Sequence, residues 1–495
     1  MSAQARHMSC RTWRYPARPA ERGLLPVNPT ESGASPLQGW LIVAAMTTCQ
    51  ALVLFDITAV GVALPNMTVD LDLSPSGAAW LVNAYLVSYT ALVALGGRLA
   101  DEWQRYRVFL LGVLLFVMGS AACGLTPSGT FLSEPWIIAF RALQGMGGAL
   151  MVPAALAIVI SSVPAEARGR AMSVYIGGGQ VFFVLGPVAG GFLTQHISWR
   201  AIFFVAVPVA AAGAALLVAV MRSAVAARPR GAATVRSGTL AMVAGMALAM
   251  LGLQQAGHSG WREGHPVVLL AAGLAAMAWF VASERGAARP LLPLELFRDD
   301  AFRRYAATLF LLQVATVGLI TFAPLLLQRG FGLTPSTAGI VMLAFIGGWA
   351  AMVPVAGILH DRFGPRRPIA IGALVAMVSL AAWTWSLTEL TVALQIPFMA
   401  LTGVGIGLSI LPANTAAVTA GDASRRAATV GLVQTMRQLG GCTSIAVLSV
   451  FFLAAPSSAP TSLVAMAQTG FLILLAVVAV NVAINIRNGR AAAAP

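Results

Sequence analysis

Hydrophobic and polar positions alternate along this chain in long blocks. Apolar runs of roughly 18–25 residues, the length that crosses a bilayer as an α-helix, are separated by short stretches of Pro, Gly and charged residues. The pattern predicts an all-α membrane protein with fourteen transmembrane helices. The expected spans are 38–64, 76–97, 106–125, 136–161, 171–193, 200–221, 238–257, 266–283, 304–328, 336–359, 367–387, 391–411, 427–453 and 464–486.

The arginines provide a test of this count. All 31 basic residues are Arg, and with the N-terminus in the cytoplasm 26 of the 31 fall in cytoplasmic tails and loops. Cytoplasmic loops of membrane proteins are enriched in basic residues in this way. Only Arg200, Arg262 and Arg329 fall on the outer side, and Arg141 and Arg437 lie within spans. We therefore expect both termini in the cytoplasm and a location in the plasma membrane, the inner membrane of a bacterium.

Composition agrees with this reading and excludes several classes of protein. The chain is 58% hydrophobic and 10% charged, with a mean hydropathy of +0.82, whereas a soluble domain carries about 25% charge. The absence of Lys excludes a P-loop ATPase and a Schiff-base enzyme. The net charge of +14 follows from topology and does not indicate nucleic acid. With Cys10, Cys49, Cys123 and Cys442 scattered singly and no HExxH or GxSxG motif, we expect no metal, no cofactor and no enzyme activity.

Two cytoplasmic loops repeat each other at an offset of 260 residues. The first reads GRLADEWQRYR from Gly97 and the second GILHDRFGPRR from Gly357, so that Asp101 matches Asp361. Internal duplication of six-helix units is typical of secondary transporters. The predicted organisation is a disordered tail (1–37), an N-terminal six-helix bundle (38–222), a segment with an extra helical pair (223–303), a C-terminal six-helix bundle (304–487) and a short tail (488–495).

At these loops the chain resembles the major facilitator superfamily, in particular its fourteen-helix drug:proton antiporter branch, over residues 40–450. WRAIFFVAVP (199–208) and RPLLPLELF (289–297) are similar to that branch as well. The resemblance implies gating loops, in which Gly97 lets helices approach and Asp101 caps a helix end and pairs with Arg105 or Arg107. The first loop departs from the family pattern at three positions, and a merely solvated loop is the alternative. The gating residues implied are Gly97, Asp101, Arg105, Gly357, Asp361 and Arg362.

Two charged residues lie within the predicted spans of the N-terminal half. Asp56 stands in LVLFDITAVGVALPNM, and Arg141 and Gln144 stand in IAFRALQGMGGAL, which resembles a family segment. A guanidinium in the bilayer costs at least about 2.5–3.5 kcal/mol, so Arg141 is expected to face a polar cavity and to have a partner. Burial favours the neutral form of a carboxyl, which suits Asp56 for binding and releasing a proton. The alternatives are an Arg141 that reaches a lipid headgroup and an Asp56 bonded only to hydroxyls such as Thr58.

Further polar and small residues complete the expected machinery. Helix 171–193 contains GGGQVFFVLGPVAGG, which is similar to an antiporter motif of the family, although small-residue packing in any membrane bundle is the alternative. The motif residues are Gly186, Pro187, Gly190 and Gly191. The expected cavity residues are Asn83, Tyr85, Gln144, Gln434 and Arg437.

These features favour a proton-coupled exporter of small amphipathic compounds, cationic ones included, working by alternating access. Its expected partners are a small-molecule substrate, protons and the lipid bilayer, and its expected state is a monomer. Asp56 and Arg141 would couple transport to protons. An exporter dedicated to one endogenous metabolite, such as an antibiotic or siderophore, and a non-transporting receptor are the alternatives.

Overall fold

The computed structural model describes residues 36–220, 237–259, 264–285, 294–389, 391–420, 426–452 and 460–491. The expectations for the N-terminal tail, for Cys10 and Arg262, for the arginines of 222–236 and for the first part of 289–297 lie outside these residues.

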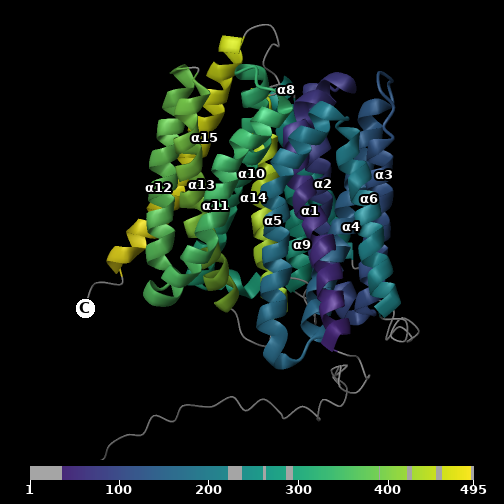
Figure 1. Ribbon diagram of the computed structural model, residues 1–495. Helices are drawn as coiled ribbons and strands as arrows, with labels where there is room; N and C mark the ends of the chain where they lie inside the picture. The colour runs from purple at the N-terminus through teal and green to yellow at the C-terminus, as the bar shows by residue number, and fades with distance from the viewer. Residues whose placement is uncertain are drawn as a thin grey trace, which may run out of the picture.

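The described part of the chain forms fourteen α-helices and no strand, which confirms the predicted fold class. Eleven of them are long and apolar enough to cross a membrane, and α2, α8 and α14 run beside these in the same bundle (Figure 1). The helices are α1 (Pro36–Asp70), α2 (Pro75–Glu102), α3 (Arg105–Gly124), α4 (Ser133–Ser162), α5 (Arg168–His196), α6 (Arg200–Val220), α8 (Ser237–Ser259), α9 (Gly264–Arg285), α10 (Asp300–Leu325), α11 (Pro335–Phe363), α12 (Arg366–Ser386), α13 (Val392–Thr419), α14 (Arg426–Phe452) and α15 (Pro460–Ala491).

Each predicted span lies on one of these helices, and the largest errors are at two prolines. The sequence pattern ends the first span before Pro65 and the twelfth before Pro412, but α1 continues through Pro65 to Asp70 and α13 through Pro412 to Thr419. Proline is tolerated inside membrane helices because neighbouring helices and side chains can satisfy the freed backbone groups. Taking proline as a helix end was wrong at both positions.

The helices pack as two groups joined by a few contacts. Helices α1 to α6 contact one another, as do α10 to α15, and the two groups meet mainly where α5 contacts α11, α2 contacts α14 and α1 contacts α10. Helices α8 and α9 pack against each other, and α8 also touches α2 and α14. In Figure 1 one group lies on the left and the other on the right, and both described chain ends lie at the lower end.

The two groups share a glycine contact that supports the internal duplication. In the first group a Cβ at Gly112 on α3 would come within 3.0 Å of the Gly147 carbonyl oxygen on α4. In the second group a Cβ at Gly372 on α12 would come within 3.0 Å of the Gly405 carbonyl oxygen on α13, and a Cβ at Gly405 would come equally close to the Gly372 carbonyl oxygen. Helix axes can approach this closely only where neither residue carries a side chain.

Candidate functional site

A buried ion pair joins α1 and α4 near the middle of the bundle. The Arg141 Nη1 donates to Asp56 Oδ2 at 2.6 Å. Both side chains are almost completely buried, at 1% and 4% exposure. In the apolar surroundings of α1 and α4, each charge depends on the other for its stability, because an unpaired buried ion is strongly disfavoured.

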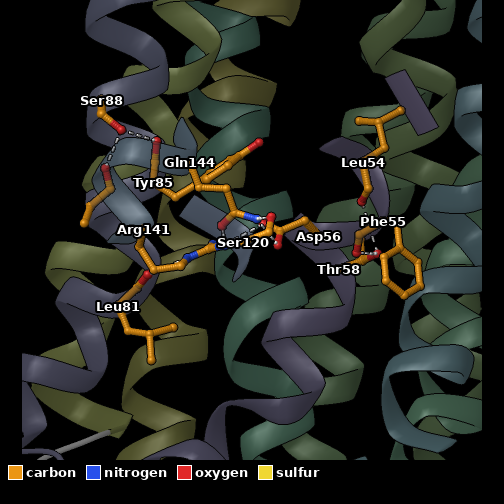
Figure 2. A network of polar contacts seen from close by, with 11 residues as sticks. Leu54, Phe55, Asp56, Thr58, Leu81, Tyr85, Ser88, Ser120, Arg141 and Gln144 are labelled. Atoms are coloured by element: carbon orange, nitrogen blue, oxygen red, sulfur yellow. Dashed lines mark hydrogen bonds and ion pairs between the residues drawn. The ribbon is translucent and has the colours of Figure 1, made fainter. Parts of the chain in front are cut away.

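Neighbouring side chains and backbone bond to further polar atoms of this pair, as Figure 2 shows. Gln144 Nε2 donates to Asp56 Oδ1 at 3.1 Å and to Ser120 Oγ at 2.8 Å, while Gln144 Oε1 accepts from Arg141 Nη1 at 2.6 Å. Arg141 Nε donates to the Leu81 carbonyl oxygen at 3.1 Å. Both Asp56 oxygens thus accept hydrogen bonds, and four helices, α1 to α4, contribute to the network.

Aromatic rings cover the guanidinium. The Arg141 Cζ lies 4.6 Å from the Tyr85 ring centroid and 5.8 Å from that of Phe203. The Tyr85 ring in turn stacks on Tyr89, with centroids 6.2 Å apart. Arg141 therefore turns inward, and the alternative in which it reaches a lipid headgroup does not describe this structure. Thr58 bonds to backbone carbonyls of its own helix and not to Asp56.

A cavity of about 910 Å³ lies between the two groups of helices. Arg141, Tyr85, Gln434 and Arg437 are among the residues that line it, whereas Asp56 lies behind Arg141 and does not. The lining continues along α2 and α4 to the end of the bundle where α2 meets α3. A cavity of this size accommodates a drug-sized ligand.

Two of the expected cavity residues do not line it. Gln144 belongs to the ion-pair network. Asn83 is fully buried, and neither polar atom of its amide has a hydrogen-bond partner. On α2 the positions that line the cavity include 82, 85, 86, 89 and 93, and position 83 points to another face of that helix.

At the opposite end of the bundle, α5 and α11 close the space between the two groups. A Cβ at Gly339 would come within 3.0 Å of the Pro187 carbonyl oxygen, and a Cβ at Gly191 would come equally close to the Pro335 carbonyl oxygen. The cavity is therefore bounded by direct backbone contact at this end. Two members of the predicted helix-5 motif, Pro187 and Gly191, form that contact.

Comparison with known proteins agrees with this architecture. The family model of the Major Facilitator Superfamily matches residues 46–445. The chain belongs to this superfamily. It is 32% identical to the tetracenomycin C resistance and export protein of Streptomyces glaucescens, over 84% of this chain and 77% of that one. It is 30% identical to the multidrug resistance protein Stp of Mycobacterium tuberculosis, over 80% and 73%.

Solved structures of transporters share the fold. A bacterial homologue of the human lysosomal transporter Spinster matches with a TM-score of 0.65 at 16% identity, covering 92% of this chain and 98% of that one. A D-xylose-proton symporter matches with a TM-score of 0.63 at 14% identity, over 90% and 97%. Membership of the superfamily makes the chain a membrane transporter and not an enzyme.

The remaining members of the helix-5 motif pack against α1. Gly186 lies against Thr58 and Gly190 against Ala59, in both cases too closely for a side chain at the glycine. Helix α5 thus contacts the helix that carries Asp56 on one side and α11 on the other. This placement shows the close-packing role, and the antiporter role of the motif stays a prediction.

The first of the superfamily's repeated loops corrects one expectation, the role of Gly97. A Cβ at Gly97 would be 3.8 Å from the nearest atom, whereas a Cβ at the neighbouring Gly96 would meet the Ala149 carbonyl oxygen within 3.0 Å. Gly96 therefore permits the close approach of α2 and α4, and Gly97 lines the cavity. Asp101 belongs to the last turn of α2, and the structure does not describe its side chain, so its expected capping role stays a prediction.

Arg105 begins α3 and its Nη1 donates to the Ala157 carbonyl oxygen of α4 at 3.4 Å. The side chain of Asp101 is not among those that the structure describes, so the expected pair between Asp101 and Arg105 remains a prediction.

The second loop lies at the end of α11. Asp361 and Arg362 are exposed in the last turn of that helix. Gly357 has only ordinary contact with Leu411, 3.5 Å from its ideal Cβ, so it does not bring helices together. The turn is made by Gly364, whose φ of 71° suits glycine.

Several site residues are missed by the sequence reading. Ser120 completes the ion-pair network, and Gln180 and Trp349 line the cavity from α5 and α11. Single Ser, Gln and Trp residues carry no local signal of function. The polar Gln180 in the apolar α5 is the one that a search for intramembrane polar residues could have found.

A second polar cluster lies at the end of the bundle where α5 and α11 meet. Asp70 at the end of α1 accepts from Arg200 at 2.6 Å and from Trp199 Nε1 at 2.9 Å. Arg200 also donates to Ser128 and to the Thr126 carbonyl oxygen. The segment 199–208, noted only as a resemblance, begins with these two residues and ties α1, α3 and α6 together.

Proposed function

We propose that this chain is a proton-coupled exporter of small amphipathic compounds that works by alternating access. The bundles 38–222 and 304–487 would move against each other, with the helical pair within 223–303 beside them. The observation that carries this proposal is the buried Asp56–Arg141 pair at the cavity wall. Relatives named for resistance and export support the direction of transport.

The geometry suggests how a proton could act on this pair. A proton and the Arg141 guanidinium compete for the same oxygen, Asp56 Oδ2. Protonation removes the charge from the carboxylate and frees Arg141, which lines the cavity, to take a second position. Gln144 bonds to both partners, so its amide must rearrange at the same time. A change of one charge at the cavity wall is thereby linked to a change in how α1 and α4 are held together.

The distribution of arginines assigns the two ends of the bundle. It favours a cytoplasmic position for the α2–α3 loop and both termini, so that the cavity, which reaches that loop, would face inward. Substrate would enter from the cytoplasm or the inner leaflet of a bacterial plasma membrane, and the contact of α5 with α11 is the closed outer gate. A single chain contains the whole cavity, which favours a monomer.

A dedicated exporter of one metabolite would use the same machinery. The relatives named for tetracenomycin C and for puromycin favour keeping this second candidate. Susceptibility of cells with and without the chain to a panel of unrelated compounds separates the two, because a dedicated exporter changes the response to one chemical class alone.

Proteoliposomes test the proposal. The full chain is reconstituted, a pH gradient is imposed, and movement of three fluorescent probes is followed: anionic anilinonaphthalene sulfonate, uncharged phenylnaphthylamine and cationic ethidium. We expect gradient-driven movement of at least one probe, lost in Asp56→Asn. The matched control is Asp70→Asn, which removes another Arg-paired carboxylate of α1 far from the cavity and should retain coupling. Movement that ignores the gradient, or normal coupling in Asp56→Asn, would contradict the proposal.

A further inference from the structure

The geometry points to an anion-binding site in the central cavity, centred on Arg437 of α14, that receives the acidic group of a flat amphipathic substrate. This inference rests on the proposed export function and specifies the chemical class of its substrate. It replaces the expectation that cationic compounds are included, which came from the presence of Asp56 alone.

The charges of the cavity wall are of one sign. Among the described residues that line the cavity are four arginines, Arg98, Arg105, Arg141 and Arg437, and no Asp or Glu. Asp56 lies behind this wall, and Arg141 already pairs with it at 2.6 Å. Arg105 lies toward the α2–α3 end, so an entering anion meets positive charge there as well.

Arg437 lacks the partner that a guanidinium at this depth requires. Its Nη2 lies 3.5 Å from Gln313 Oε1, a neutral acceptor at the limit of hydrogen bonding, and its Nε is buried without a partner. Within the described part of the chain, no carboxylate forms an ion pair with it. A guanidinium presents parallel N–H groups that bind a carboxylate or sulfonate through two hydrogen bonds. A ligand anion would supply the negatively charged acceptor that α10 and α14 do not provide for Arg437.

Three more polar atoms of the same wall are buried and unpaired. They are the Tyr85 hydroxyl, Gln180 Oε1 and Trp349 Nε1, from α2, α5 and α11. Two of the three can donate a hydrogen bond to a substrate oxygen. Buried polar groups without partners are rare in folded proteins. The Tyr85 hydroxyl and Trp349 Nε1 fit a ligand with oxygen acceptors, whereas Gln180 Oε1 would need a donor on the ligand.

Aromatic rings of the cavity wall indicate the shape of the rest of the ligand. The ring centroids of Phe183 on α5 and Trp349 on α11 lie 5.1 Å apart, and both residues line the cavity. Tyr85 and Tyr89 form a stacked pair on the facing helix α2. Flat apolar surfaces on two sides suit an aromatic ring system, with its acidic group directed to Arg437. The inside-negative membrane potential would itself drive such an anion outward.

Binding to the purified full chain in lipid nanodiscs tests the inference with a matched pair of probes. Anilinonaphthalene sulfonate and phenylnaphthylamine share the same ring system and differ in the sulfonate. We expect Arg437→Gln to weaken sulfonate binding by about 10-fold or more, the value of one charge-assisted hydrogen bond, and to change phenylnaphthylamine binding by less than about 2-fold. Arg437→Lys should restore part of the sulfonate affinity. The control Arg329→Gln, a half-buried arginine of the same half that does not line the cavity, should bind as the wild type does.

Two results would overturn the inference: wild-type protein that binds the uncharged probe but not the sulfonate, or equal loss of both probes in Arg437→Gln with no rescue by Lys. Gradient-driven movement of the probes in proteoliposomes is measured separately and tests the proposed function. If both probes bind as expected but a pH gradient moves neither, the proposed function fails and the anion site stands. If ethidium alone is moved by the gradient, export stands and the anion site fails.

Discussion

The contact of α5 with α11 offers a direct perturbation of alternating access. In Gly339→Ala the new methyl would lie within 3.0 Å of the Pro187 carbonyl oxygen, closer than real Cβ contacts occur. The two helices must then separate, and forced packing of this kind costs about 1–3 kcal/mol. The cost falls only on the conformation in which this end is closed. The balance between the two conformations should therefore shift by roughly 5- to 150-fold toward the one open at this end.

Distance measurement between spin labels reports that shift. Phe131 and Trp385 are exposed, at 89% and 65%, on the two groups of helices and at the same end as the α5–α11 contact. Labels on cysteines at these positions, in a background without native cysteines, should show a longer distance whose population rises in Gly339→Ala. Double electron–electron resonance resolves the two populations.

Gly347→Ala is the matched control, because it lies on the same helix α11 and a Cβ there meets nothing within 4 Å. Both variants gain the same helix propensity from alanine, about 1 kcal/mol, so this general effect cancels. The reasoning is refuted if Gly339→Ala and Gly347→Ala give the same distance distribution. Gly191→Ala, which meets the Pro335 carbonyl oxygen, should repeat the effect of Gly339→Ala.

Three further predictions concern single side chains. Gln144→Leu removes the donor to Asp56 Oδ1, so gradient-driven flux should fall at least about 10-fold while the protein still elutes as a folded monomer; unchanged flux would count against the network. Tyr85→Phe removes a hydroxyl without a partner and keeps the ring over Arg141, so the melting temperature should stay near wild type and only probe affinity should change; a large loss of stability would show a structural bond. Asp70→Asn breaks a partly exposed ion pair, so thermal unfolding should show a loss of no more than about 1 kcal/mol, with coupling retained.

Most of the fold could be predicted because a membrane imposes a length and an apolar composition on each helix. The ends of α1 and α13 could not, since Pro65 and Pro412 are tolerated within them. The sequence predicts that Gly97 allows the close approach of two helices, but the structure has Gly96 at the contact of α2 with α4. Sequence spacing does not fix which face of α2 meets α4.

The site was predictable in its charged members and not in its arrangement. Asp56 and Arg141 are conspicuous as charges within apolar spans, but their separation of 85 positions in the sequence gives no sign of their direct contact. Ser120 and Trp349 are common residues in membrane helices and carry no signal alone. The unpaired state of Arg437 is visible only in three dimensions, because it depends on which side chains of α10 and α14 face it.

Proton movement measured directly tests the central claim, that Asp56 exchanges protons for substrate. Proteoliposomes containing the full chain and an internal pH dye receive an outwardly directed gradient of a transported probe, with no pH gradient at the start. The account predicts that probe efflux acidifies the interior with wild-type protein and with Asp70→Asn, and leaves internal pH unchanged with Asp56→Asn. Probe efflux with no change of pH in the wild type, or the same acidification in Asp56→Asn, would contradict it.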